Sequence, residues 1–487
     1  MGRTLSVLTN QEVSRAINSY HESNRLSLEI YNYLLQRFGD SSGDFSPISN
    51  IFGLFFHDLM IHFSGIVIQR EFVRQDKNEI VAFPFGSTKY ARRPFIIDEQ
   101  SYMDNSSKRN SVKKFWRTGG IVPLAVGEGV PLDIRGQWLM RKSLTLLGKY
   151  QPFCKAYLPH REQQIDALCE VVRTLAQRFE IPAEEHLIEN WANYSRHHTS
   201  SVQSRIKDDQ VILGTRAVLQ NRKLAMNFLQ QDKDVIAMTH GEITSTIFNE
   251  PLFGYAELGF CSTLIDYGDL RLDAPLHESL SKPNKFLSRT SVSVQKIQNR
   301  RNVRGASTKS GGGKKKILYI PTTYNEKFHY GPYRGFEDGL YLKWQSELIA
   351  AVPELTIKPH PKCIRPPFDC RQDERALQRC YLDYDVIILD YYSTAATLMI
   401  ATDKPVIFFD IGLRNLVPDY QLLLKQRCDY VQIDWALDLS DQIRRSVNVP
   451  VDHSSVAARS KFSRFSIVTR SSDDWRGIRW IPYKGIS

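Results

Sequence analysis

Cysteine is scarce and unpaired in this sequence, and its distribution excludes several classes of protein. Seven cysteines are scattered over 487 residues, and no two of them form a CxxC pair. An odd, scattered set neither builds a disulfide framework nor supplies the paired thiolates of a structural zinc site. We therefore expect the chain to work in a reducing cytoplasm.

Long uninterrupted apolar runs are also missing. The nearest approach is residues 50–68, and the middle of that run carries His57, Asp58 and His62. A charged side chain at the centre of a bilayer is costly, so we expect a buried core helix there rather than a membrane span. The first residues lack a basic stretch leading into a short apolar core, and we expect no secretory signal.

Acidic residues are absent from residues 282–316, which hold eleven lysines and arginines. This number equals the net charge of the whole chain, +11, so the remainder is balanced. The segment is rich in Ser, Asn and Gly, and we expect residues 282–314 to form a flexible basic linker. Nucleic-acid binding is an alternative, but the interleaved aromatics of such binders are lacking. Contact with anionic lipid headgroups suits the segment better.

The linker divides the chain into two expected α/β domains, residues 1–281 and 315–487. In the first, apolar residues at helical spacing predict a helix over 161–182, and apolar runs predict strands at 234–240 and 262–268. The second alternates strand-like and helical segments more regularly, as a doubly wound parallel sheet does. Its predicted strands are 315–324, 355–361, 385–390 and 404–410, and its predicted helices are 339–352, 373–383 and 395–402.

The carboxyl ends of strands are where doubly wound sheets bind ligands, and hydroxyl and basic side chains gather there in the second domain. Ser393 and Thr394 follow the third strand directly before a predicted helix, whose first N–H groups favour an anion. The alternative is that either residue only caps the helix. His360 follows the second strand between two prolines that restrict its backbone. We interpret these features as a phosphate site.

A second histidine follows the predicted strand at 234–240 in the first domain. His240 is succeeded by Gly241, which allows close backbone approach, and by Glu242. The two ionisable side chains suit general acid–base work. A simple turn is the alternative, because a His-Gly pair alone is a weak signal.

The order of these motifs resembles GT-B transferases that build bacterial surface polysaccharides, such as capsule and lipopolysaccharide, from cytidine-nucleotide donors. One branch comprises capsular sialyl-, Kdo- and related ulosonic-acid transferases, whose His-Pro and Ser-Ser/Thr motifs match His360-Pro361 and Ser393-Thr394. Their acidic-acidic-Gly motif matches only at 337–339, too near His360, and we interpret those acids as part of a helical first turn. Arg334-Gly335 before that helix resembles a further group of surface-carbohydrate transferases.

The other branch comprises the CDP-glycerol glycerophosphotransferases of teichoic-acid synthesis. It shares the His-Gly pair, a Pro-Thr strand, the KPHP element at 358–361 and the KPVIFF strand at 404–409. The sequence STAATLMIATDKP at 393–405 lacks the acidic residue that this branch places a few positions after its serines. We therefore keep a CDP-polyol phosphotransferase as the alternative, and a non-catalytic nucleotide-binding protein as a second one.

The resemblance implies two Rossmann-like domains facing a central cleft, with the donor on the second domain and the acceptor entering from the first. It implies metal-independent transfer of a sugar, expected to be an ulosonic acid from a CMP-linked donor, to a glycan or lipid-linked acceptor. No cofactor besides the donor is expected, and the protein would act in the cytoplasm or at the inner face of the membrane. The expected catalytic residues are His240, Glu242 and His360, and the expected nucleotide-binding residues are Gly241, Thr322, Thr323, Arg334, Lys358, Pro361, Lys362, Asp390, Ser393 and Thr394.

Overall fold

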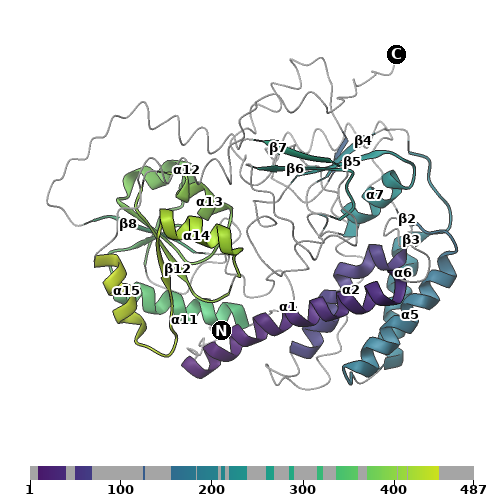
Figure 1. The fold of residues 1–487 in the computed structure, drawn as a ribbon, viewed down its shortest axis with the longest axis horizontal. Coiled ribbons are helices and arrows are strands. Elements are labelled where there is room, and N and C mark those ends of the chain that lie inside the picture. The colour runs from purple at the N-terminus through teal and green to yellow at the C-terminus, as the bar shows by residue number, and fades with distance from the viewer. Residues whose placement is uncertain are drawn as a thin grey trace, which may run out of the picture.

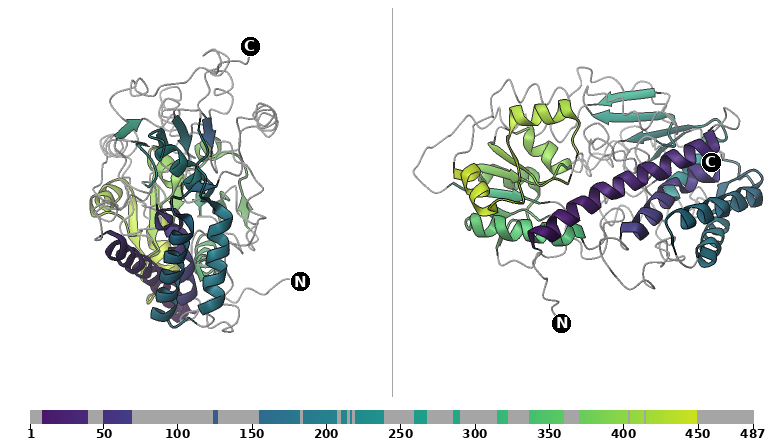
Figure 2. Two further views of the ribbon diagram at one scale, coloured as in Figure 1. Left: turned by 90° about the vertical axis from the view of Figure 1, so that its right-hand side faces the viewer. Right: turned by 60° about the horizontal axis from the view of Figure 1, so that its bottom comes forward.

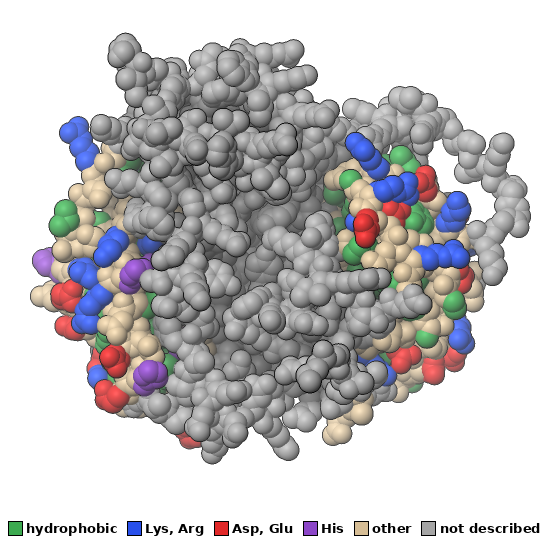
Figure 3. Space-filling model, turned by 180° about the vertical axis from the view of Figure 1, so that it is seen from behind, with side chains coloured by type: hydrophobic (Ala, Val, Ile, Leu, Met, Phe, Trp, Pro, Cys, Tyr) green, Lys and Arg blue, Asp and Glu red, His purple; other side chains and the backbone are tan. Residues whose placement is uncertain are grey.

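Two parallel β-sheets with covering helices make up the described part of the chain (Figure 1). The computed structural model describes residues 9–39, 50–68, 124–126, 155–181, 184–206, 210–213, 216, 219–238, 259–267, 285–289, 315–321, 336–359, 370–402, 404–413 and 415–448. Seen from behind, acidic and basic side chains are interspersed over the described surface at both sides of the molecule (Figure 3).

The N-terminal sheet has five strands in the order β1-β4-β5-β6-β7, and every neighbouring pair is parallel. The predicted strands at 234–240 and 262–268 are confirmed as β5 and β6. Its strands are β1 (Leu124–Val126), β4 (Gln210–Leu213), β5 (Asp234–Met238), β6 (Thr263–Tyr267) and β7 (Lys285–Arg289). A separate parallel pair joins β2 (Ala156–Tyr157) to β3 (Thr199–Ser200).

The C-terminal sheet has six strands in the order β10-β9-β8-β11-β12-β13, again all parallel. Numbered along the chain, this is the 3-2-1-4-5-6 order of dinucleotide-binding sheets. The prediction of a doubly wound α/β sheet is confirmed here. The strands are β8 (Ile317–Ile320), β9 (Thr356–Ile357), β10 (Arg371–Gln372), β11 (Val386–Leu389), β12 (Val406–Asp410) and β13 (Asp429–Gln432).

The central strands of this sheet are apolar throughout because both of their faces are covered. In β8, Ile317 and Tyr319 pack into one buried cluster, while Leu318 and Ile320 pack into another on the opposite face. Helices supply the other side of each cluster (Figure 1). The first face is covered by α11 (Phe336–Ala351) and α15 (Leu439–Asn448), and the second by α12 (Leu377–Cys380), α13 (Thr394–Ile400) and α14 (Pro418–Arg427).

The N-terminal half is rich in helices that share one buried core with strands of the first sheet. The predicted helix over 161–182 is confirmed as α5, which ends at Arg178. Among the residues that the structure describes, the longest helix is the 30-residue α1, which crosses from the C-terminal sheet to these helices (Figures 1 and 2). The helices are α1 (Asn10–Gly39), α2 (Ile51–Ile68), α5 (Arg161–Arg178), α6 (Glu184–His198) and α7 (Leu219–Leu229).

The apolar run at 50–68 forms α2, and residues 51–60 are all buried. The prediction of a core helix is therefore confirmed. Among the helices that the structure describes, none combines the length and apolarity that a membrane span requires. The buried Asp58 is paired with Arg222 of α7, whose Nη2 lies 2.8 Å from Oδ2 of Asp58. Burial alone would raise the pKa of Asp58, but Arg222 and His57 together hold the pKa below its usual value.

Two local predictions were wrong. Residues 285–289, expected within the basic linker, form β7 and pair in parallel with β6, so the N-terminal sheet extends into that segment. The remainder of the expected linker up to residue 314 lies outside the described residues. The helix predicted over 373–383 reduces to α12 and a 3-10 turn at Tyr381–Asp383. The Asp373 carboxylate accepts from the backbone N–H of Arg375, and such a turn competes with helix formation.

Replacing Arg222 by methionine should destabilise the protein strongly. The Arg222 side chain is completely buried and donates to the carbonyls of Leu54 and Arg216 as well as to Asp58. Loss of its charge leaves Asp58 buried without its partner, which costs about 3–5 kcal/mol in the free energy of unfolding. Chemical denaturation measures this.

The matched control is Arg173→Met, which breaks an exposed pair with Glu170 and should cost less than about 1 kcal/mol. Equal losses in the two variants would contradict the assignment of Arg222 as the buried link between α2 and α7.

Candidate functional site

The carboxyl ends of the strands of the C-terminal sheet meet at one edge, because all six strands are parallel. The strand order reverses between β8 and β11: β9 and β10 lie on one side of β8, and β11, β12 and β13 lie on the other. In open α/β sheets, ligands bind at such a reversal, outside the carboxyl ends. The segments that follow β9, β8 and β11 therefore form the candidate site.

Tyr319 of β8 connects the strands on both sides of this reversal. Its carbonyl accepts from the backbone N–H of Lys358, 2.8 Å away, directly after β9. Its hydroxyl donates to Oδ2 of Asp390, directly after β11. Both side chains are buried, and burial together with the Asp390 carboxylate raises the pKa of Tyr319 well above its usual value. Tyr319 therefore donates a fixed hydrogen bond that orients the Asp390 carboxylate.

The turn after Asp390 leads into α13 through an extended residue. Ser393 is the N-cap, with φ −153° and ψ 175°, and its side chain makes no capping hydrogen bond. Its carbonyl accepts from the backbone N–H of Thr397 at 3.0 Å. Tyr392 stabilises the turn, because its buried hydroxyl contacts the hydroxyls of Thr397 and Tyr420. Ser393 thus occupies the N-cap position of the seven-residue α13 through its backbone, and the alternative that its hydroxyl serves as a capping group is not supported.

Lys358 lies on the β9 side of the same edge. Its side chain is buried, and its Nζ donates to the carbonyl of Pro359 at 3.0 Å. The ammonium group thus braces the backbone of the Lys-Pro step that precedes His360 in the chain. Lys358 and Ser393 flank β8 on opposite sides at one sheet edge. The structure therefore places the expected segments after β9 and β11 at the same edge, and it describes the first of them up to Pro359.

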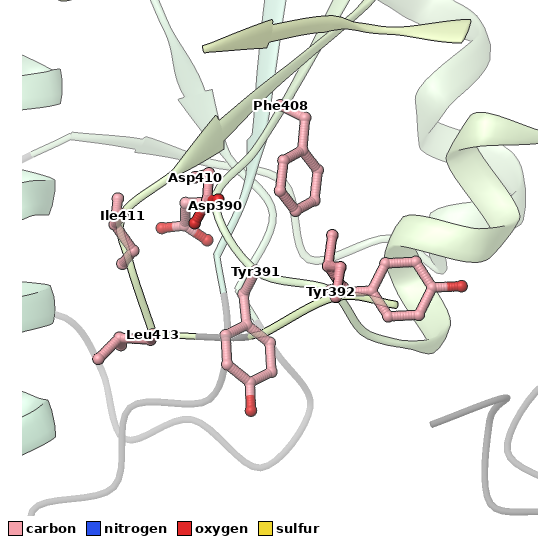
Figure 4. A pocket seen from close by; sticks show the side chains of 8 residues that line it. Asp390, Tyr391, Tyr392, Phe408, Asp410, Ile411 and Leu413 are labelled. Carbon is pink, nitrogen blue, oxygen red and sulfur yellow. The ribbon is translucent and has the colours of Figure 1, made fainter. Parts of the chain in front are cut away.

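A small pocket lies beside the reversal, at the carboxyl ends of β11 and β12 (Figure 4). Two carboxylates, Asp390 and Asp410, face it from neighbouring strands. The Asp410 carboxylate accepts from the backbone N–H of Gly412 and from the hydroxyl of Tyr430. The lining residues are Asp390, Tyr391, Tyr392, Phe408, Asp410, Ile411, Leu413 and Leu416.

The charge of this pocket limits what can enter it. The lining residues that the structure describes include two carboxylates and three aromatic rings, and none of them is a lysine or an arginine. Carboxylate oxygens accept hydrogen bonds from hydroxyl and amino groups and repel phosphate. The pocket has a volume of about 10 Å³, enough for about one water molecule. The described lining therefore suits a single hydroxyl or amino group better than a phosphate oxygen.

A third strand-end carboxylate, Asp373 after β10, is occupied by its neighbours. It accepts from Nε of Arg375 at 3.0 Å and from the hydroxyl of Tyr384 at 3.1 Å. Hydrogen bonds from Arg375 lower the pKa of Asp373 to about 2. Asp373 is therefore the ion-pair partner of Arg375, whereas the hydrogen bonds described for Asp390 and Asp410 come from the uncharged donors Tyr319, Gly412 and Tyr430.

Only part of the predicted site lies among the described residues. Lys358, Asp390 and Ser393 do, and Thr394 begins α13. Tyr319 and Asp410 were not expected as site residues; the signals for them were a lone hydroxyl within the apolar strand ILYI and an acid at the end of the strand VIFFD. The predicted residues outside the described part are His240, Gly241, Glu242, Thr322, Thr323, Arg334, His360, Pro361 and Lys362.

The described residues contain no group of three His, Cys, Asp or Glu side chains arranged to hold a metal ion. Metal-independent chemistry stays a prediction. Comparisons with protein-family models, with curated proteins and with solved structures gave no match to this chain. The fold and the geometry of the sheet edge therefore carry the functional argument.

Replacing Tyr319 by phenylalanine tests the central contact of this edge. The change removes the hydroxyl that donates to the buried Asp390 carboxylate, and we expect a loss of about 1–3 kcal/mol in the free energy of unfolding. Denaturant titration measures it. Tyr33→Phe, on α1 and remote from the sheet edge, is the control and should change stability by less than about 0.5 kcal/mol. A Tyr319→Phe variant as stable as the control would refute the bond.

Proposed function

We propose that this chain is a glycosyltransferase of the GT-B type that transfers a sugar from a cytidine-nucleotide donor to a glycan acceptor of a bacterial surface polysaccharide. The observation that carries the proposal is the strand order of the C-terminal sheet, whose reversal lies between β8 and β11. The expected donor-binding segments follow β9, β8 and β11, the strands at and next to this reversal. The parallel N-terminal sheet is compatible with a second Rossmann-like domain that carries the acceptor.

The distribution of charge at the sheet edge supports separate binding sites for the phosphate of the donor and for one of its hydroxyl groups. Ser393 offers a hydroxyl that takes no part in capping, next to the first turn of α13, and His360 follows Pro359 in the chain. These groups and Lys362 would bind the phosphate. One hydroxyl of the donor would then point into the small pocket beside Asp390 and Asp410, whose described lining suits a hydroxyl better than a phosphate oxygen.

The chemistry follows from these roles. In the CMP-linked case, the bond between the anomeric carbon of the sugar and the phosphate oxygen breaks, and CMP leaves with the electron pair. His360 and the amides at the start of α13 stabilise the negative charge on the leaving phosphate. The acceptor hydroxyl oxygen forms the new bond to the anomeric carbon, and its proton passes to His240 or Glu242.

The proposed donor site predicts that cytidine nucleotides bind at the reversal and that Ser393 and His360 hold them. We expect CMP to raise the melting temperature more than UMP or GMP does. Ser393→Ala and His360→Ala should each weaken CMP binding about tenfold, the size of one hydrogen bond to a charged group. His360→Ala should also abolish sugar transfer while the protein remains folded.

Ser201→Ala, at an exposed position remote from the C-terminal sheet, is the control and should leave CMP affinity unchanged. Near-wild-type transfer by His360→Ala would refute the donor-site assignment. Stronger stabilisation by CDP than by CMP would favour the CDP-polyol phosphotransferase. Nucleotide binding without donor turnover, across a panel of CMP-, CDP- and UDP-linked donors, would favour the non-catalytic alternative.

A further inference from the structure

Helix α1 belongs to the cores of both halves of the molecule. In its first turns, Val13 is completely buried in the cluster between the C-terminal sheet and α11, and Ile17 packs against that cluster. In its later turns, Leu26 and Ile30 are buried in the N-terminal core. A helix of 30 residues is about 45 Å long, and α1 spans the described halves along this length (Figure 2).

The middle of α1 lies against the loop that follows β12. Nε2 of His21 is 3.0 Å from the carbonyl oxygen of Gly412. A carbonyl only accepts, so the imidazole donates this bond through Nε2. Gly412 has φ +86°, a conformation that favours glycine, and a side chain placed there would lie 3.7 Å from Cδ1 of Ile17. The helix is thus seated directly on the backbone of this loop.

The same loop forms one wall of the pocket. Ile411 and Leu413 line it, and the N–H of Gly412 donates to Oδ1 of Asp410 at 2.9 Å (Figure 4). Nε1 of Trp435 also donates to the carbonyl of Ile411 at 3.1 Å. The position of the Asp410 carboxylate therefore depends on a loop that both α1 and Trp435 contact.

The far part of α1 is fastened to the N-terminal helices. Besides the buried Leu26 and Ile30, Glu29 forms an ion pair with Arg178 at the end of α5. Backbone hydrogen bonds keep α1 rigid. Movement of the N-terminal core would therefore be transmitted along α1 to the loop after β12, which the helix contacts in the C-terminal half. The relative position of the two halves and the position of Asp410 are then linked.

We infer that α1 is a positioning element for the pocket, and that Ile17 and His21 are the positioning residues through which it sets the 410–413 loop. Ligand occupancy of the pocket and the relative placement of the two halves are thereby coupled. The inference rests on the proposed function only for the identity of the ligand, a cytidine nucleotide. The contacts between α1 and the loop do not depend on it.

Hydrogen exchange of the full chain tests the contact with the loop. His21→Ala and Ile17→Ala should speed exchange of the amides in 408–413 by about twofold to tenfold, the range for one lost hydrogen bond or contact. The indole N–H resonance of Trp435, assigned with Trp435→Phe, should shift in the same variants. Asn18→Ala, at an exposed position of the same helix, should leave both readouts unchanged. Unchanged exchange in both test variants would overturn the inference.

Ile30→Ala tests the coupling, because this residue is anchored in the N-terminal core and far along α1 from the loop. Coupling predicts faster exchange in 408–413 in this variant too, at a temperature where circular dichroism shows it folded. Faster exchange confined to α1, α2 and α5 would overturn the coupling.

CMP affinity is measured alongside by calorimetry and should fall in His21→Ala but not in Asn18→Ala. An unchanged affinity in His21→Ala would overturn the link to ligand binding. If the wild-type chain binds no CMP, the proposed function fails, and the exchange data still decide the role of α1.

Discussion

A hydrogen bond from Tyr319 to Asp390 joins β8 to β11 at the point where the order of the C-terminal sheet reverses. The same tyrosine binds the backbone of Lys358 through its carbonyl, so one residue in the middle of a four-residue strand ties together the ends of three neighbouring strands. Because Tyr319 and Asp390 are buried, this bond is stronger than it would be at the surface. The turn that carries Ser393 and the pocket wall formed by Asp390 both follow from it.

The sheet edge is divided by charge into two parts. The pocket beside β11 and β12 has two carboxylates, and the start of α13 offers amides and an uncommitted hydroxyl. The proposed donor would use this division, with its phosphate near Ser393 and a single hydroxyl at the small pocket. The position of the loop after β12 matters for this pocket. Gly412 and Tyr430 donate hydrogen bonds to the Asp410 carboxylate, so movement of either residue changes which further hydrogen bonds Asp410 can accept.

The local pattern of the C-terminal sheet could be predicted from the sequence. Continuous apolar runs such as VIIL and VIFF identify strands buried on both faces, and the predicted segments match β8, β9, β11 and β12. Asp390 and Ser393 could be identified because they directly follow a strand. The order of the strands could not be predicted, because pairing between segments far apart in the chain is decided by packing that no local window contains.

The errors have the same origin. Residues 285–289 look like a linker by composition, yet they pair with β6, a tertiary contact that outweighs their local preference. The contact of Tyr319 with Asp390 links residues 71 positions apart, and that of His21 with Gly412 links residues 391 apart. The helix α1 was not anticipated, because its polar composition hides the two separate apolar stretches that enter different cores.

Hydrogen exchange of the wild-type chain with and without saturating CMP tests most directly whether the reversal between β8 and β11 is the ligand site. The amides that follow β11, at 390–395, and those of Lys358, His360 and Lys362 after β9 should exchange more slowly when the nucleotide is present. Protection confined to the opposite edge of the sheet, at the residues that precede β8 and β11, would contradict the account.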